Sequence, residues 1–319
     1  MKLDTRQAAE LLKQQDNVLI LMHKNPDGDT IGSGYALYYA LTDMGKRAAL
    51  ACSDPIPDKY GYMTEPVQPH TEEPSFVVAV DIADVQLLGD LEETYATRVD
   101  LCIDHHMTNT LYAKDTCLYK TAGATCEIMT DIIGKLGTDI TKRIADCLYT
   151  GTATDTGCFK YSNTSSHTHL VAARLIEAGA DYVAINREMF DTKSKNRLLL
   201  EQAALSGMEF HFDDRCAVIT VTREMFARTG AKEADLDGVS ALSRQVRGVE
   251  VGVMLREKED GSIKVSIRTT SWVNASDICR HFGGGGHIRA AGCVLNGPME
   301  AAKARLLEQV EAALKEQAK

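Results

Sequence analysis

The chain has 319 residues and a formal net charge of −10, with 44% apolar and 25% charged residues, which is typical of a soluble globular protein with two domains. No apolar run approaches the roughly 20 residues of a membrane-spanning helix, and residues 1–7 lack the apolar core of a signal peptide. Nine cysteines without a C-x-x-C pair argue against a disulfide framework. We therefore expect a cytoplasmic protein without a membrane partner. Since 16 of the 35 Lys/Arg and 17 of the 45 Asp/Glu lie in residues 201–319, the first 200 residues hold 19 basic and 28 acidic side chains, which disfavours binding of long duplex nucleic acid.

Residues 1–185 alternate short apolar runs with amphipathic stretches. The expected strands are Val18–Met22, Arg47–Cys52, Phe76–Val80 and Val99–Ile103. The expected helices are Thr30–Met44, Gly123–Leu136, Asp139–Thr150 and Ser166–Ala178. Strands that alternate with helices predict right-handed crossovers and an α/β fold with a doubly wound, mostly parallel sheet. The proline-rich segment Cys52–Pro74 is predicted to be a loop-rich excursion between two strands.

The remainder of the chain predicts a linker and a smaller α+β domain. Residues 186–205 are polar and compatible with a linker helix. The expected strands after it are Cys216–Val221, Val249–Leu255, Ile263–Ile267 and Gly292–Leu295, and the expected final helix is Met299–Gln317. Asp260-Gly261 predicts a hairpin turn between two alternating runs. We therefore expect a first domain over 1–185, a linker over 186–205 and a second domain over 206–319, with a cleft between the domains.

Histidine and aspartate side chains follow three of the expected strands at the point where each strand ends. They are His23, Asp27, Asp29, Asp81, Asp104, His105 and His106. Because ligands bind beyond the carboxyl ends of parallel strands, near the switch in strand order, we expect these side chains to lie together. Asp155, in a small-residue segment expected to follow a helix, adds a further carboxylate. Imidazole and carboxylate without thiolate favour Mn²⁺, Mg²⁺ or Co²⁺, and two such ions about 4 Å apart can clamp a phosphate with a bridging hydroxide as nucleophile.

In this order the motifs resemble those of the DHH phosphoesterase superfamily: His23-x3-Asp27-Gly-Asp29, Asp81, Asp104-His-His106 and Asp155. The segment Phe282–Gly292 contains four consecutive glycines and a histidine, and it resembles the signature of the DHHA1 domain of that superfamily. The resemblance covers nearly the whole chain at the spacing of the short NrnA-like members. Those members degrade oligoribonucleotides of a few residues and dephosphorylate adenosine 3′,5′-bisphosphate (pAp).

The resemblance implies a centre with two divalent ions, of which Mn²⁺ is expected and Mg²⁺ or Co²⁺ are alternatives. One ion would be held by His23, Asp27 and Asp81, and the other by Asp29, Asp81, His105 and Asp155, with Asp81 bridging. Asp104 would orient a histidine ring as part of the catalytic machinery. His106 would contact the scissile phosphate or assist the leaving oxygen, and Asn109 is a weaker candidate for support of the substrate-binding loop.

The glycine run Gly283–Gly286 has two interpretations. It could serve only a tight turn, because glycine adopts backbone angles that other residues avoid. Alternatively, Gly284 and Gly285 could bring bare backbone N–H groups close to a phosphate. His287 beside the run and Arg268 nearby favour ligand binding. Arg268 would pair with a non-scissile phosphate in bidentate fashion, and His287 would stack on the nucleotide or hydrogen-bond to it.

The implied activity is an Mn²⁺-dependent hydrolase of ester bonds. Its substrates would be short RNA oligonucleotides, pAp and linear dinucleotides such as pApA and pGpG, and a homodimer is compatible with this expectation. Alternatives are a cyclic-dinucleotide phosphodiesterase, a family II inorganic pyrophosphatase, which would have a different second domain, and a non-catalytic nucleotide sensor, which would have lost metal ligands. A tRNA-editing protein with a DHHA1 domain would lack the first-domain motifs. The chain departs from the family at Gln86, where members often carry an arginine.

Overall fold

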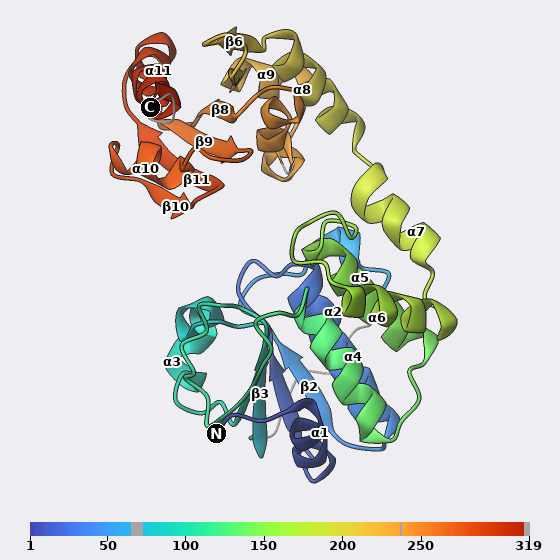
Figure 1. Cartoon of the computed structure of the whole chain (residues 1–319). Helices are drawn as coiled ribbons and strands as arrows, with labels where there is room; N and C mark the ends of the chain where they lie inside the picture. Colours follow the sequence, from blue (N-terminus) through green and yellow to red (C-terminus); the bar gives the residue numbers. More distant parts are fainter. Residues whose placement is uncertain (65–72, 237, 316–319) are drawn as a thin grey trace. The chain divides into compact units, whose positions relative to one another are not determined.

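The computed structural model describes residues 1–64, 73–236 and 238–315, and the chain divides into two compact units, Met1–Thr192 and Lys193–Lys319 (Figure 1). Segment 186–205, expected as a single linker helix, is divided between them. It contains η3 (Arg187–Asp191) in the first unit and most of α8 (Lys195–Ser206) in the second. Within the described ranges, no helix has both the length and the apolar character needed to cross a membrane.

The first unit is built on the parallel sheet that the sequence predicts. Its strands are β1 (Val18–Leu21), β2 (Ala48–Ala51), β3 (Phe76–Val80), β4 (Leu101–Asp104) and β5 (Asp115–Leu118). Their order is β2-β1-β3-β4-β5, and all four neighbouring pairs are parallel. β1 and β3 are buried along their whole length, as expected for strands covered on both faces. The strand order reverses between β1 and β3, which places the switch point at the ends of these two strands.

Helices cover both faces of this sheet. They are α1 (Thr5–Lys13), α2 (Gly28–Asp43), α3 (Glu92–Tyr95), α4 (Thr125–Leu136), α5 (Lys142–Asp155), α6 (Ser166–Glu177) and α7 (Tyr182–Asn186), with short helices η1 (Asp58–Tyr60) and η2 (Val85–Leu91). Figure 1 shows α1, α2 and α4 on one side of the sheet and α3 on the other, and each side has its own hydrophobic cluster. η1 falls in the expected loop-rich excursion, of which residues 65–72 lie outside the described residues.

The second unit is a smaller α+β structure with a six-stranded sheet. Its strands are β6 (Glu209–His211), β7 (Cys216–Val221), β8 (Val251–Glu257), β9 (Ile263–Thr269), β10 (Gly285–His287) and β11 (Ala290–Leu295), in the order β10-β11-β9-β8-β7-β6. Only β7 and β8 pair in parallel. The predicted turn at Asp260-Gly261 joins β8 to β9, where Gly261 has a φ of +80° that favours glycine.

Helices also cover the two faces of the second sheet. α10 (Ala275–Arg280) and α11 (Met299–Lys315) pack on one face, and α8 and α9 (Arg223–Thr229) contribute to a cluster on the other. Three short 3₁₀ helices lie between α9 and β8, namely η4 (Glu233–Leu236), η5 (Val239–Ala241) and η6 (Ser243–Gln245). The end of the expected final helix, Gln317, lies outside the described residues.

Candidate metal centre

The first motif lies in the turn between β1 and α2. Asp27 is the N-cap of α2, and its Oδ1 accepts hydrogen bonds from the backbone N–H groups of Asp29 (3.0 Å) and Thr30 (3.2 Å). His23 Nδ1 lies 2.8 Å from the carbonyl oxygen of Lys24, so Nδ1 carries the proton and donates it. The Nε2 atom of His23 therefore faces Asp27 Oδ1 and Asp81 Oδ2, each 3.6 Å away.

Asp81 lies directly after β3 with its backbone in the left-handed region, at a φ of +61°. Such a conformation costs free energy in a residue other than glycine, although aspartate tolerates it better than most, and it is common at functional sites. The turn directs the buried carboxylate between two imidazoles, because Oδ2 faces His23 and Oδ1 lies 3.7 Å from His105 Nε2. Thr125 Oγ1 donates a 2.8 Å hydrogen bond to Oδ1. Asp81 thus faces the Nε2 atoms of both His23 and His105.

Asp29 joins the centre to the start of α4. Its carboxylate is buried and accepts the backbone N–H of Thr125 at 2.7 Å and that of Cys126 at 2.8 Å. The N-cap of α4 is Ala124, whose side chain cannot cap the helix. A carboxylate from α2 thus caps α4 and lies at the positive end of its dipole. Neither this cap nor the Thr125 hydroxyl was expected, because both depend on how α4 packs against α2.

His105 and Asp155 complete the second group of ligands. His105 Nδ1 lies 3.1 Å from the carbonyl oxygen of Ala122, so its proton is held there. Its Nε2 faces three carboxylates, at 3.4 Å from Asp155 Oδ2, 3.7 Å from Asp81 Oδ1 and 3.8 Å from Asp29 Oδ2. Each histidine therefore directs its Nε2 atom at acidic oxygens, which is the arrangement of metal ligands oriented by a backbone carbonyl.

The expectation that Asp155 follows a helix was wrong, because Asp155 is the last residue of α5. The threonine-rich stretch before it continues the helix. The hydroxyls of Thr150, Thr152 and Thr154 donate to carbonyl oxygens four residues earlier, at 2.7, 2.8 and 2.9 Å. Such side-chain hydrogen bonds let threonine persist within a helix. The end of α5 consequently reaches the switch point of the sheet.

The negative charge of the clustered carboxylates favours the binding of protons or metal cations. Burial, together with repulsion from Asp81 and Asp155, raises the pKa of Asp29 well above its usual range. Burial also raises the pKa of Asp155 to about 6. For His23, burial acts in the opposite direction, but its interactions with Asp27 and Asp81 raise the pKa to about 11. The cluster thus takes up protons when no cation neutralises it, and a divalent ion can replace them.

The six residues predicted as metal ligands come together at the switch point. Three groups offer ligand atoms that lie within 4.8 Å of one another: His23, Asp27 and Asp81; Asp29, His105 and Asp155; and Asp81, His105 and His106. Nitrogen and oxygen donors without thiolate fit Mn²⁺ and related ions. The donor set and the convergence of the Nε2 atoms on the carboxylates therefore fit a centre for divalent metal.

Asp104 and Asn109 lie behind the metal-facing side chains. Asp104 is fully buried, and its Oδ1 accepts a 2.8 Å hydrogen bond from His106 Nδ1. Its Oδ2 accepts a 2.6 Å hydrogen bond from Asn109 Nδ2, while Asn109 Oδ1 accepts the N–H of Leu111 at 2.8 Å. The amide of Asn109, predicted to bind substrate, is thus engaged within its own loop. Asp104 orients the ring of His106, as expected for a residue that acts through a histidine.

His106 is the most exposed of the clustered histidines, with 42% of its side chain accessible. The hydrogen bond to Asp104 is the main reason that its pKa rises to about 9, against the opposing effect of burial. At neutral pH the ring is therefore protonated on both nitrogens, with Nδ1 committed to Asp104 and Nε2–H available as a donor.

The residues predicted to bind substrate in the second unit lie around β10, β11 and β9. Ala290 of β11 pairs with Arg268 on one side and with His287 on the other, so both side chains lie on the same face of the sheet. Gly284 is required by packing, because a Cβ there would lie 2.3 Å from the carbonyl oxygen of Gly292. Gly285 faces open space and lines a cavity of about 450 Å³ with its neighbours.

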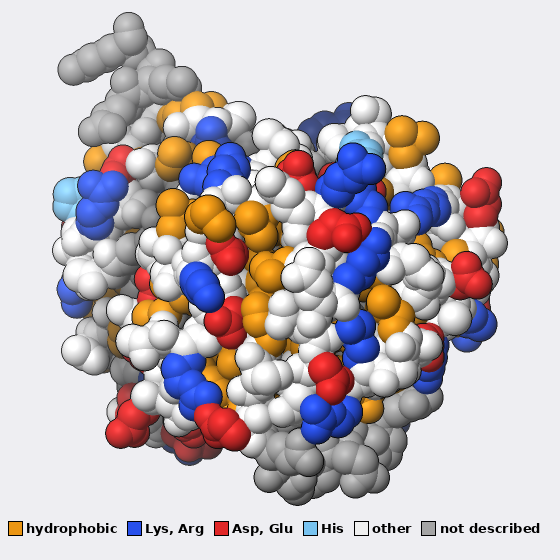
Figure 2. All heavy atoms as spheres, turned by 90° about the horizontal axis from the view of Figure 1, so that it is seen from below, with side chains coloured by type: hydrophobic (Ala, Val, Ile, Leu, Met, Phe, Trp, Pro, Cys, Tyr) orange, Lys and Arg blue, Asp and Glu red, His pale blue; other side chains and the backbone are white. Residues whose placement is uncertain are grey.

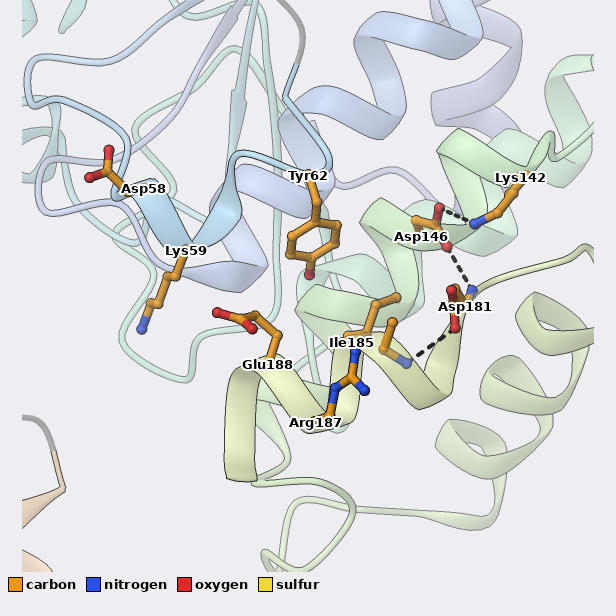
Figure 3. A pocket seen from close by; sticks show the side chains of 10 residues that line it. Asp58, Lys59, Tyr62, Lys142, Asp146, Asp181, Ile185, Arg187 and Glu188 are labelled. Carbon is orange, nitrogen blue, oxygen red and sulfur yellow. Dashed lines mark hydrogen bonds and ion pairs between the residues drawn. The ribbon is translucent and has the colours of Figure 1, made fainter. Parts of the chain in front are cut away.

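The first unit also has a pocket of about 490 Å³ that is lined by none of the predicted metal ligands (Figure 3). It is lined by residues of η1, α5, α7 and η3. Lys142 and Asp146 form a 2.7 Å ion pair there, and the N–H of Asp181 donates to Asp146 at 2.8 Å. Among the described residues, the pocket lacks a group of histidine and carboxylate ligands, and we assign it no role.

Comparison with known protein families gives two matches. Residues 17–152 match the DHH family, N-terminal domain, and residues 214–316 match the DHHA1 domain. The first match contains five of the six predicted metal ligands and stops just before Asp155. The second contains the glycine run, Arg268 and His287.

Individual relatives match along almost the whole chain. A bifunctional oligoribonuclease and PAP phosphatase NrnA from Thermus thermophilus is 35% identical, over 96% of this chain and 93% of the relative. A probable bifunctional oligoribonuclease and PAP phosphatase NrnA from Streptococcus mutans is 23% identical, over 88% and 90%. The crystal structure of an exopolyphosphatase-related protein from Bacteroides fragilis is similar with a TM-score of 0.85 and 25% identity, covering 98% of this chain and 95% of that one.

Proposed function

Because the chain belongs to the DHH family and carries a DHHA1 domain, we propose that it is a phosphoesterase that hydrolyses short oligoribonucleotides to mononucleotides and pAp to AMP. The observation that carries this proposal is Asp81, a single buried carboxylate that faces the Nε2 atoms of two histidines. The activity in the names of the NrnA relatives supports these substrates. A cytoplasmic location and a homodimer stay predictions from the sequence.

The cofactor proposed is a pair of divalent ions, with Mn²⁺ as the physiological metal. His23, Asp27 and Asp81 would hold one ion, and Asp29, Asp81, His105 and Asp155 would hold the other. When bound, the ions would supply the Lewis acidity that activates water and offsets the charge of the phosphate. The protein's own contribution is to fix the ligands, through the carbonyl oxygens of Lys24 and Ala122 and the first turn of α4.

His106 is the proposed proton donor to the leaving oxygen. Its ring is anchored at Nδ1 by Asp104, so Nε2–H is the group that can reach substrate. A pKa of about 9 keeps this proton in place at neutral pH until an alkoxide begins to form. Asp104 acts through His106 and is a positioning residue, and Asn109 supports Asp104 from the other side.

The second unit would bind the nucleotide. Arg268 can pair with a non-scissile phosphate, His287 can stack on a base or hydrogen-bond to it, and Gly285 lines a cavity of about 450 Å³. Residues 201–319 hold 16 basic and 17 acidic side chains, which offers little for a long strand to follow. On the face shown in Figure 2, basic side chains are likewise interspersed with acidic ones. This distribution of charge supports short substrates.

Product analysis tests the proposal. Mn²⁺-loaded protein would be incubated with 5′-labelled RNAs of two to twenty-four nucleotides, pAp, cyclic di-AMP and pyrophosphate. We expect mononucleotides from the dinucleotide, AMP from pAp, and rates that fall steeply with length. Asp81→Ala, the matched inactive control, should lose turnover while keeping the far-ultraviolet circular dichroism of the wild type.

Other outcomes would point to the alternative functions. Pyrophosphate or the cyclic dinucleotide as the sole good substrate would reverse the assignment within the superfamily. Tight binding of dinucleotides without turnover by the metal-loaded protein would indicate a sensor. Near-normal turnover by Asp81→Ala would exclude the proposed centre.

A further inference from the structure

On the second sheet, small residues flank Arg268 on both neighbouring strands. Across β10, β11, β9 and β8 the register aligns His287, Ala290, Arg268 and Gly252 in one row. Aligned residues in antiparallel neighbours project to the same face. Ala290 therefore offers only a methyl group on one side of the Arg268 side chain, and Gly252 offers no side chain on the other.

The 3₁₀ helix η6 crosses this face directly over Gly252. A Cβ placed on Gly252 would lie 2.7 Å from the backbone nitrogen of Arg244, 2.7 Å from Ser243 Oγ and 3.0 Å from Arg244 Cβ. Glycine is thus needed here because the crossing segment occupies the place of a side chain. Since Cβ atoms of directly paired residues lie about 5 Å apart, the side chain of Arg244 starts next to that of Arg268.

The two guanidinium groups have no acidic partner in the part of the chain that the structure describes. Among the described residues, neither arginine has a carboxylate within ion-pairing distance, and the hydrogen bond of Arg268 is to the carbonyl oxygen of its neighbour Ile267. Burial and the charge of Arg244 lower the pKa of Arg268, which places the two charges in each other's field. Ser243 Oγ, buried over the same glycine, has no hydrogen-bond partner in the described structure.

Two adjacent cations without an anion repel each other and destabilise the fold locally. Their repulsion becomes attraction when a dianion binds to both. Arginine presents its donors in a planar fork that matches phosphate oxygens, and two forks can hold a terminal phosphate more tightly than one.

We propose that Arg244 and Arg268 together bind a terminal, non-scissile phosphate of the substrate. This inference rests on the proposed function, and it adds Arg244 as a specificity-determining residue. The paired site selects nucleotides that carry a terminal phosphate over those that end in a hydroxyl. It also explains Gly252, the residue that lets η6 bring Arg244 to Arg268.

Binding measured without turnover tests this proposal. Calorimetric titration of the metal-free full chain in EDTA would compare pApA with ApA, which lacks the terminal phosphate. We expect Arg244→Ala to weaken binding of pApA about tenfold, which corresponds to about 1.4 kcal/mol, and to leave ApA unchanged. Arg247→Ala is the matched control, because Arg247 is an exposed arginine three residues further along the same segment. That variant should bind both ligands as the wild type does.

The results separate this inference from the function on which it rests. If Arg268→Ala weakens pApA binding while Arg244→Ala does not, the paired site is refuted and the proposed function stands. Equal losses for pApA and ApA in Arg244→Ala would also refute it, because the effect would not involve the phosphate. If the wild type binds neither dinucleotide and hydrolyses neither, the proposed function itself fails.

Discussion

Replacing Asp155 with asparagine should stabilise the metal-free protein and weaken its response to metal. Asp155 brings a carboxylate into a group that already contains Asp27, Asp29 and Asp81, and its Oδ2 lies 3.4 Å from His105 Nε2. Neutralising an ordinary surface aspartate does not raise the free energy of unfolding of a protein. Neutralising Asp155 should raise it when no metal is bound, because the charge of this partly buried carboxylate, among other carboxylates, opposes folding.

The magnitude follows from the pKa of Asp155, which is raised from 3.8 to about 6, chiefly by burial. A shift of two pH units corresponds to about 3 kcal/mol. Because the folded state holds the proton more tightly than the unfolded state, the cost develops as pH rises from about 4 to 6 and stays constant above. Asp155→Asn should therefore gain up to about 3 kcal/mol at pH 8 and nothing below pH 4.

Thermal unfolding followed by circular dichroism measures both effects. In EDTA at pH 8 the variant should unfold roughly 6–12 °C above the wild type, at the 2–4 °C per kcal/mol typical of units of 150–250 residues. With Mn²⁺ at 100 times its dissociation constant, the wild type should gain about 2.7 kcal/mol, and the variant should gain far less. Asp146→Asn, also on α5 but paired with Lys142, is the matched control and should leave the response to Mn²⁺ intact.

Two results would refute this reasoning. One is a lower melting temperature of Asp155→Asn in EDTA at pH 8, since the carboxylate would then stabilise the fold without metal. The other is a wild-type response to Mn²⁺ in the variant, since Asp155 would then not hold an ion.

Three further predictions concern the same centre. Thr125→Val should weaken Mn²⁺ binding, measured by calorimetry, by tenfold or more, because a charge-assisted hydrogen bond to Asp81 contributes about 1.5–3 kcal/mol. Thr125→Ser, which keeps the hydroxyl, should bind Mn²⁺ as the wild type does. An equal loss in Thr130→Val, further along α4, would show a general packing effect instead. Asp104→Asn should lower the pKa of His106 from about 9, so the alkaline limb of the pH profile of kcat should move to lower pH. If that limb does not move, His106 is not the proton donor. Mn²⁺ binding should release protons and tighten with rising pH, because cluster groups have raised pKa values; identical heats in buffers of different ionisation enthalpy would contradict this.

The sheet of the first unit was predictable because its central strands are apolar throughout. β1 and β3 are buried on both faces, and their bounds differ from the predicted ones by at most one residue. β5 was missed, since this short edge strand includes Asp115 and Thr116 and lacks a continuous apolar run. α1 was also missed, although Asp4 and Gln7 form a capping box that the sequence displays.

The linker expected over 186–205 shows where composition misleads. Its polar residues suggested a connecting helix or linker between the domains. In the structure the chain leaves η3 at Asp191 and starts a new helix at Lys195, capped by Ser194 Oγ, which accepts the N–H of Arg197. Leu200 and Ala204 are then buried in the second unit. A helix that buries only one narrow stripe looks polar in sequence.

The clustering of the proposed metal ligands was predictable because the carboxyl ends of parallel strands lie at one edge of the sheet. His23, Asp81 and His105 all follow strands, and strand topology alone brings them together. The residues that hold those ligands were not predictable. Thr125 reaches Asp81 only because of how α4 lies against the sheet, and Arg244 reaches Arg268 only because η6 crosses Gly252. Supporting contacts depend on tertiary packing, which no local pattern encodes.

The central claim is that six side chains form a two-ion centre around Asp81. Anomalous diffraction from crystals of the Mn²⁺-loaded protein tests it most directly. We predict two peaks about 4 Å apart, one contacting His23, Asp27 and Asp81, and the other contacting Asp29, Asp81, His105 and Asp155. A single peak, or two peaks that do not share Asp81, would contradict the account.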